Sequence, residues 1–319
     1  PSTWISSAGR SGVDIAGRLR SSAMTRLDRR TFILGVAGAG VLTACGDDSD
    51  STSTSSSDPE TGTPAFLQPT FPAGVPGTVL AAGVEQRLTF VLHDGVDTMR
   101  ANAPASVEIE ITRDGTTYAS GPVPIHDDGI LTPYYPVRFL PDAAGDYEVR
   151  VVDHPDMLPV PVTVLDRAEV AVVQVGDQMR PVDTPTIDDA RGVDPICTRA
   201  VPCDFHTMTL TEALASGTPT VFIISTPGFC QTDICGPVLE LLIDATEGRD
   251  DLAIVHAEVY TDPQNPPTGG AFPETTETID TYALPYEPQL LVADAGGTVV
   301  ARLDTMWDRT ELTEALATI

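Results

Sequence analysis

Hydrophobic and polar residues follow two different patterns along this chain. Between residues 75 and 167, short runs of alternating apolar and polar residues are separated by Asp-Gly pairs, a pattern typical of antiparallel strands joined by tight turns. The predicted strands are Leu88–Leu92, Ser106–Thr112, Tyr134–Phe139, Tyr147–Val152 and Pro159–Val164. Because no amphipathic segment of helix length interrupts them, the pattern predicts an all-β sandwich over residues 75–167.

Residues 168–319 alternate strand-like with helix-like segments instead. The predicted strands are Glu169–Val175, Val221–Ile224, Leu252–Val259, Gln289–Ala293 and Thr298–Leu303. The predicted helices are Leu210–Ala215, Pro237–Thr246, Thr276–Tyr282 and Arg309–Thr318. This alternation predicts an α/β domain.

The start of the chain has the pattern of an export signal. Residues 1–44 carry a basic flank and a short apolar stretch, and small residues precede Cys45. The segments Arg29–Ile33 and Leu42–Cys45 resemble the twin-arginine motif and the lipobox of exported bacterial lipoproteins. The resemblance implies that the signal is removed, that Cys45 carries a lipid, and that the protein is anchored to the cell membrane outside the cytoplasm. The alternative is an amphipathic helix that stays on the protein.

Two further predictions concern the N-terminal region. Residues 1–23 precede Met24 and are expected to be an over-extended start of the reading frame. Residues 45–74 are rich in Ser, Thr and Asp, and such a segment cannot bury enough apolar area to fold. We therefore expect a disordered tether between the lipid and the first domain.

The charge of the chain excludes several functions. The formal net charge is −28, which repels nucleic acid, so no nucleic-acid partner is expected. All 18 basic residues are arginine. The absence of lysine excludes Schiff-base catalysis and a P-loop.

Four cysteines remain once Cys45 is assigned to the lipid: Cys197, Cys203, Cys230 and Cys235. An even set in an oxidising compartment indicates disulfides, and the sequence allows three pairings. Cys230 and Cys235 lie between a strand-like and a helix-like segment, where backbone N–H groups can stabilise a thiolate. Thiol redox chemistry is the function that this position favours.

The segment Glu169–Ile319 resembles the thioredoxin-like superfamily. Cys235-Gly236-Pro237 is similar to the start of the Cys-Gly-Pro-Cys motif, Glu287–Val292 to the cis-proline segment, and Asp294–Val300 to the closing hairpin. In this chain Val238 stands where the family has its resolving cysteine. The resemblance implies a thioredoxin-like α/β C-terminal domain.

The first domain has a resemblance of its own. Residues Ala143–Val149 are similar to the tyrosine-corner region of immunoglobulin-like sandwiches. The fold expected for the whole chain is therefore an all-β immunoglobulin-like sandwich followed by a thioredoxin-like domain. Together with the export signal, this organisation predicts a membrane-tethered thiol-disulfide oxidoreductase.

The expected substrates are protein thiols and disulfides. Cys235, in the first turn of a helix, is the expected reactive sulfur, and Cys230 is its partner in the disulfide. A competing assignment makes Cys230 the exposed nucleophile and Cys235 the resolving thiol. The thioredoxin resemblance assigns substrate seating to Pro288. Thr232 stands in a Thr-x-x-Cys segment that resembles peroxiredoxins, which implies a thiol peroxidase as an alternative; Arg302 or Arg309 would then assist.

Two other functions stay open. A copper site similar to that of Sco-type chaperones would combine two thiolates with His206 or His256, and copper is expected as a cofactor only in that case. A non-enzymatic surface scaffold would use its disulfides structurally.

The other cysteine pair is predicted to have a structural role. A disulfide between Cys197 and Cys203 is expected to staple their loop, with a relay to Cys230 and Cys235 as the alternative. Three histidines without ligand spacing are expected to be solvated or capping: His93, His126 and His154.

Overall fold

A computed structural model describes residues 63–70, 79–230, 234–265 and 273–319. Contacts group residues 57–319 into one compact unit. The predicted export signal, Cys45 and most of the predicted tether lie outside the described residues, and so does Thr232. The predicted domain boundary at residues 167 and 168 stays a prediction.

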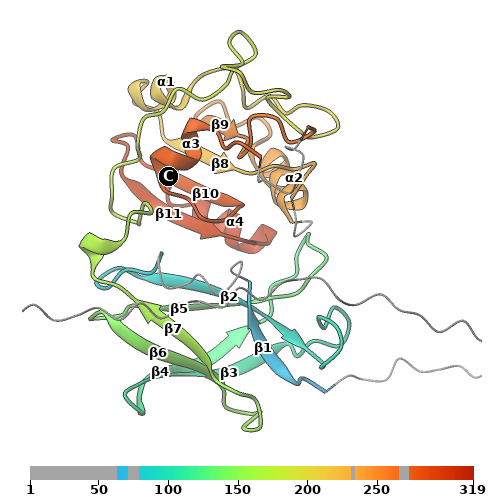
Figure 1. Cartoon of the computed structure of the whole chain (residues 1–319), viewed down its shortest axis with the longest axis vertical. Coiled ribbons are helices and arrows are strands. Elements are labelled where there is room, and N and C mark those ends of the chain that lie inside the picture. Colours follow the sequence, from blue (N-terminus) through green and yellow to red (C-terminus); the bar gives the residue numbers. More distant parts are fainter. Residues whose placement is uncertain (1–62, 71–78, 231–233, 266–272) are drawn as a thin grey trace, which may run out of the picture. The chain divides into compact units, whose positions relative to one another are not determined.

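Eleven strands form three sheets in the described part of the chain (Figure 1). The first sheet is antiparallel and has the order β1 (Phe66–Pro69), β2 (Gln86–His93), β5 (Tyr135–Phe139). The second is also antiparallel, with the order β4 (Thr116–Pro124), β3 (Ser106–Arg113), β6 (Gly145–Val151), β7 (Val160–Val164). The third has the order β11 (Val299–Asp304), β10 (Gln289–Ala293), β8 (Thr220–Ile224), β9 (Ala253–Ala257), and only β8 and β9 run parallel in it.

Helices are few and short. The α-helices are α1 (Leu210–Ala215), α2 (Cys235–Thr246), α3 (Glu277–Tyr282) and α4 (Arg309–Leu316), with a single described 3₁₀ turn η3 (Arg167–Glu169). The predicted combination of a thioredoxin-like α/β domain with an immunoglobulin-like sandwich is therefore wrong. Eleven strands in three sheets against four helices make a β-rich protein.

One misassigned segment accounts for part of this error. Glu169–Val175 was expected to open the α/β domain as a strand, but no strand forms there. Val170, Val172 and Val173 are buried in the apolar cluster, whereas Val175 is exposed. The amide of Gln174 donates to the carbonyls of Val79 and Val172, both at 3.1 Å. The apolar residues of this segment predict a strand, but its backbone forms a loop.

The other strands and helices of the C-terminal part agree with the sequence pattern to within a few residues. The N-terminal part contains two strands that the pattern did not predict. Strand β4 was missed, and β1 lies within the range expected to be a disordered tether. β1 pairs with β2 along its whole length, and Leu67 is 5% exposed because it packs into the apolar core cluster.

The third sheet is buried on both faces. In β8, Phe222 and Ile224 belong to one apolar cluster, with residues of α1 and α3. Val221 and Ile223 belong to another cluster, with residues of α2 and α4. A strand buried on both sides reads as a continuous apolar run, which explains why this strand was predicted from sequence.

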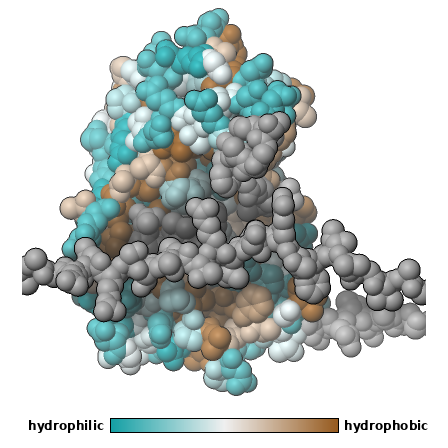
Figure 2. Space-filling view, viewed as in Figure 1, coloured by the Kyte–Doolittle hydropathy of each residue, from teal (hydrophilic) through white to brown (hydrophobic). Residues whose placement is uncertain are grey.

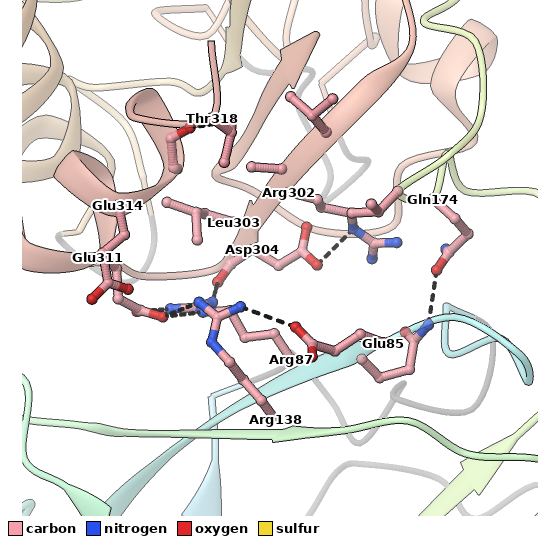
Figure 3. Close-up of a pocket in the computed structure, with 15 residues that line it drawn as sticks. Glu85, Arg87, Arg138, Gln174, Arg302, Leu303, Asp304, Glu311, Glu314 and Thr318 are labelled. Carbon is pink, nitrogen blue, oxygen red and sulfur yellow. Dashed lines mark hydrogen bonds and ion pairs between the residues drawn. The ribbon is translucent and has the colours of Figure 1, made fainter. Parts of the chain in front are cut away.

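A buried ion pair connects β2 to α4 (Figure 3). The Arg87 guanidinium donates to both carboxylate oxygens of Glu311, and Arg138 donates to the same group at 2.7 Å. Arg87 also donates to the main-chain carbonyl of Asp304, at 3.0 Å. Burial by itself would raise the pKa of Glu311, but the charge and hydrogen bonds of Arg87 outweigh it and lower the pKa to about 2.

The face that Figure 2 shows carries both hydrophilic areas and hydrophobic patches. Among the described residues, no helix combines the length and the apolar character needed to cross a bilayer.

We predict that Glu311→Gln lowers the free energy of unfolding by about 3–5 kcal/mol, because it leaves the Arg87 guanidinium buried without a counter-charge. Urea denaturation followed by circular dichroism measures the change. Glu314→Gln, an exposed position on the same helix, is the matched control and should change little. Replacing Arg87 and Glu311 together with Met and Leu should cost less than Glu311→Gln alone. An equal loss in both glutamate variants would contradict this account.

Candidate functional site

The candidate site lies where β8 ends and α2 begins. The chain leaves β8 at Ser225 and turns back, and α2 begins at Cys235. Ile234 precedes the helix, and its apolar side chain does not cap the first N–H groups of α2. Such a helix N-terminus favours negative charge on the residue that opens it. The sulfur of Cys235 is placed where a thiolate is stabilised.

Cys230 and Cys235 form a disulfide. Their Cα atoms are 5.9 Å apart, within the range of natural disulfides. The two sulfurs differ in access: Cys235 is fully buried at 0% exposure, whereas Cys230 is half-buried. Phe229, just before Cys230, is 45% exposed. A molecule arriving from solvent therefore meets the sulfur of Cys230 first.

A carboxyl group lies beside the buried sulfur. Oε2 of Glu287 is 3.7 Å from Sγ of Cys235 and accepts a hydrogen bond from the Thr226 backbone N–H at 2.7 Å. Burial raises the pKa of Glu287 to about 7, and the hydrogen bonds from Thr226 oppose part of that rise. A carboxyl group with this pKa exchanges protons near neutral pH.

Sequence reasoning did not assign a role to Glu287. It identified only the cis-proline segment around Pro288. The structure supplies a carboxyl group from the residue before Pro288. The Glu287–Pro288 peptide bond is cis, as predicted.

A cavity of about 820 Å³ opens beside the disulfide. Cys230 and Glu287 both line it, together with apolar residues such as Ile234 and with residues of the first sheet. Arg100 and Glu287 are the charged residues among the described lining residues. A largely uncharged cavity of this size suits a peptide segment or a small organic molecule.

The second cysteine pair differs from the prediction. Cys197 and Cys203 are free thiols whose sulfurs are 3.9 Å apart, so the structure does not form the predicted staple. The Cys203 sulfur lies 3.4 Å from the ring nitrogen Nδ1 of His256. His206 is adjacent, with its Nε2 3.1 Å from the same nitrogen. Nδ1 of His256 also lies 3.9 Å from the Cys197 sulfur, so both sulfurs face an imidazole.

A smaller cavity, of about 270 Å³, lies beside the Arg87–Glu311 pair (Figure 3). Its charged residues are largely engaged with one another. Arg302, for example, forms an ion pair with Asp304 at 2.8 Å and donates to the Tyr286 hydroxyl at 2.7 Å. We assign this region a structural role, because its charges compensate each other.

Comparison with protein-family models gives no match, and no curated protein matches the chain. The interpretation of the site therefore depends on the chemistry of its own residues.

We predict that protein purified without reductant contains the Cys230–Cys235 disulfide and free thiols at Cys197 and Cys203. The test is alkylation of the denatured, unreduced protein, followed by peptide mass spectrometry. The alkyl label should appear on Cys197 and Cys203, while Cys230 and Cys235 should stay linked. A bond from either member of one pair to the other pair would contradict the structure.

Proposed function

We propose that this protein exchanges thiols and disulfides through Cys230 and Cys235. The observation that carries the proposal is the asymmetry of the pair: one sulfur is accessible, and the other is buried beside a carboxyl group with a pKa of about 7. A purely structural disulfide needs neither feature. Exchange uses both, because an accessible sulfur can be attacked and a nearby acid can protonate the sulfur that leaves.

Access assigns the roles of the two cysteines. An incoming thiolate attacks Sγ of Cys230 and forms a mixed disulfide with it. The electron pair of the broken bond passes to Sγ of Cys235, which leaves as a thiolate. This favours the competing assignment from the sequence, in which Cys230 reacts with the partner and Cys235 resolves.

The leaving sulfur is supported in two ways. The N-terminus of α2 stabilises its negative charge. Protonated Glu287 can then pass its proton to the thiolate across 3.7 Å, which gives a neutral thiol and a carboxylate. In the reverse direction the carboxylate takes the proton back, and the Cys235 thiolate attacks Cys230 and releases the partner.

The same steps oxidise a dithiol. The second thiolate of the substrate attacks its own sulfur in the mixed disulfide, and Cys230 leaves as a thiolate. The substrate then holds a disulfide, and the protein holds two reduced cysteines. The direction of net flow depends on the reduction potential of the pair relative to the partner.

The expected partners are extended segments of exported proteins that carry thiols or disulfides. The cavity beside Cys230 is large enough for such a segment. Export and membrane attachment through Cys45 would place the site in an oxidising compartment and are part of this proposal.

The described residues favour exchange over a peroxidase. The two arginines considered for a peroxidase are engaged elsewhere: Arg302 with Asp304, and Arg309 with Asp244 at 3.5 Å. A scaffold with a structural disulfide is the remaining competitor. It differs from exchange in requiring no reactivity of Cys230.

We predict that Cys235→Ser traps a mixed disulfide at Cys230. With a small aromatic disulfide as the probe, the variant should gain one adduct per chain, located on Cys230 by peptide mapping. Cys230→Ser leaves only the buried Cys235 in the pair and should react at least about tenfold more slowly, because the sulfur needs local opening to be reached. Faster labelling of Cys235 would reverse the roles, and no adduct in either variant would support the scaffold.

Glu287→Gln tests the proton transfer. The rate at which a small thiol reduces the Cys230–Cys235 disulfide is measured between about pH 5 and 9, a range that brackets the Glu287 pKa. Each rate is divided by the concentration of the reagent's thiolate form at that pH. For the natural protein this quotient should fall as pH rises through about 7, because Glu287 loses its proton there. In the variant it should be flat, and below neutral pH lower by about tenfold or more.

Glu274→Gln is the control, since this glutamate is exposed. It should keep the pH dependence of the natural protein. A flat profile in the natural protein would show that Glu287 does not supply the proton, without bearing on the trapping experiment.

A further inference from the structure

Two thiols and two imidazoles meet inside the protein, next to the turn that carries Cys230. Three of these groups come from one loop that precedes α1 (Figure 1), and the fourth comes from β9. All four are buried: their exposures are 3% for Cys197, 7% for Cys203, 2% for His206 and 0% for His256. One ligand atom from each lies within 4.8 Å of the others. Thiolate and imidazole are the ligands of structural zinc sites.

The distances fit a tetrahedron around one ion. With Zn–S bonds of about 2.3 Å and Zn–N bonds of about 2.0 Å, tetrahedral ligands lie about 3.8 Å apart for two sulfurs, about 3.5 Å for sulfur and nitrogen, and about 3.3 Å for two nitrogens. The two sulfurs here are 3.9 Å apart. Nδ1 of His256 lies 3.4 Å from Cys203, 3.9 Å from Cys197, and 3.1 Å from Nε2 of His206.

The orientation of His256 suits a metal ligand. Its Nε2 lies 3.0 Å from the carbonyl oxygen of Ser225. Because a carbonyl only accepts hydrogen bonds, Nε2 carries the proton and Nδ1 turns its lone pair towards the two sulfurs and His206. Ligating histidines commonly donate their other N–H to a backbone carbonyl in this way.

Among the described residues, the His206 ring has no hydrogen bond outside this cluster. Its Nε2 faces the cluster, and its buried Nδ1 has no hydrogen-bond partner among the described residues. A disulfide between Cys197 and Cys203 would give the buried His206 ring no ligand role. Ligation through Nε2 would fix it.

We propose that Cys197, Cys203, His206 and His256 bind one Zn²⁺ ion as a structural site. Two thiolates and two neutral imidazoles balance the charge of a divalent ion, and a neutral site suits complete burial. Cu(I) would leave one negative charge uncompensated. An iron–sulfur cluster needs more room than four atoms this close together provide.

The site would act on the exchange turn through Thr198, the residue after Cys197. The Thr198 hydroxyl accepts a hydrogen bond from the Gly228 backbone N–H at 2.9 Å. Glu258 holds Thr198 from the other side, accepting from its backbone N–H and its hydroxyl. An added Cβ at Gly228 would lie 2.6 Å from the Thr198 carbonyl oxygen, so the loop and the turn are packed tightly. The ion would fix the Cys197–Thr198 loop, against which the turn with Gly228 and Cys230 packs.

The test uses the full chain, reduced with a phosphine and stripped of metal. One equivalent of Co²⁺ should give thiolate-to-cobalt charge-transfer bands and the intense visible bands of tetrahedral cobalt, and one equivalent of Zn²⁺ should abolish both. Cys203→Ser should lose this one-to-one binding. The double variant Cys230→Ser/Cys235→Ser should keep it, which separates this site from the exchange pair.

Alkylation keeps the proposal testable if Cys203→Ser fails to fold. Zn²⁺ should protect Cys197 and Cys203 in the reduced natural protein, while Cys230 reacts. Three outcomes would overturn the proposal: no stoichiometric binding of Co²⁺ or Zn²⁺, bands that disappear in the Cys230→Ser/Cys235→Ser variant, or a Cys197–Cys203 disulfide in metal-free protein as isolated. Retention of Cu(I) by a protein that binds neither Co²⁺ nor Zn²⁺ would also contradict it.

Discussion

The pairing of β8 with a neighbour on each side is the constraint on which both clusters depend. On one side β9 runs parallel to it, and His256 is in register with Ile223. On the other side β10 runs antiparallel, and Gln289 is in register with Ile224. Strand β9 brings the His256 imidazole to the end of β8, and β10 brings Glu287 there. His256 lies within the β8–β9 ladder and Glu287 lies two residues before β10, so strand pairing sets where the backbone of each residue lies.

The two residues that follow β8, Ser225 and Thr226, each bind one of these side chains through a main-chain group. The Ser225 carbonyl accepts the N–H of His256, and the Thr226 N–H donates to Glu287. These two main-chain groups can serve side chains because the ladder ends here. A strand end has unpaired polar groups that must find partners when they are buried, and here the partners are chemically active side chains.

The strands of the third sheet could be predicted from the sequence more fully than the side-chain contacts of the candidate site. The bounds of β10 agree with the predicted Gln289–Ala293, because a strand buried on both faces leaves a continuous apolar run. Strand β4 was missed because Thr, Ser, Gly and Pro dominate it and none of its residues is fully buried. Its place in the sheet comes from pairing with β3, which a local pattern does not contain.

The side-chain clusters show the same limit more sharply. Cys230 and Cys235 are five residues apart, so their pairing could be proposed from spacing. Cys203 and His256 are 53 residues apart, and their contact exists only because β9 adds to β8. Glu287 and Cys235 are 52 residues apart, and their contact depends in the same way on the pairing of β10 with β8. A sequence motif can reveal groups that lie in one turn. Groups that strand pairing brings together can be predicted only when the register of the strands is known.

Burial also explains why four cysteines can remain two separate pairs in one small region. Exchange between pairs needs a thiolate that reaches a disulfide sulfur. The accessible sulfur of the bonded pair is Cys230, while Cys197 and Cys203 are each below 10% exposure and face imidazoles. If Zn²⁺ holds those two as thiolates, their lone pairs are engaged and their attack on Cys230 is slowed further. Loss of the ion would free two thiols beside a reactive disulfide, so the metal would protect the pairing as well as the loop.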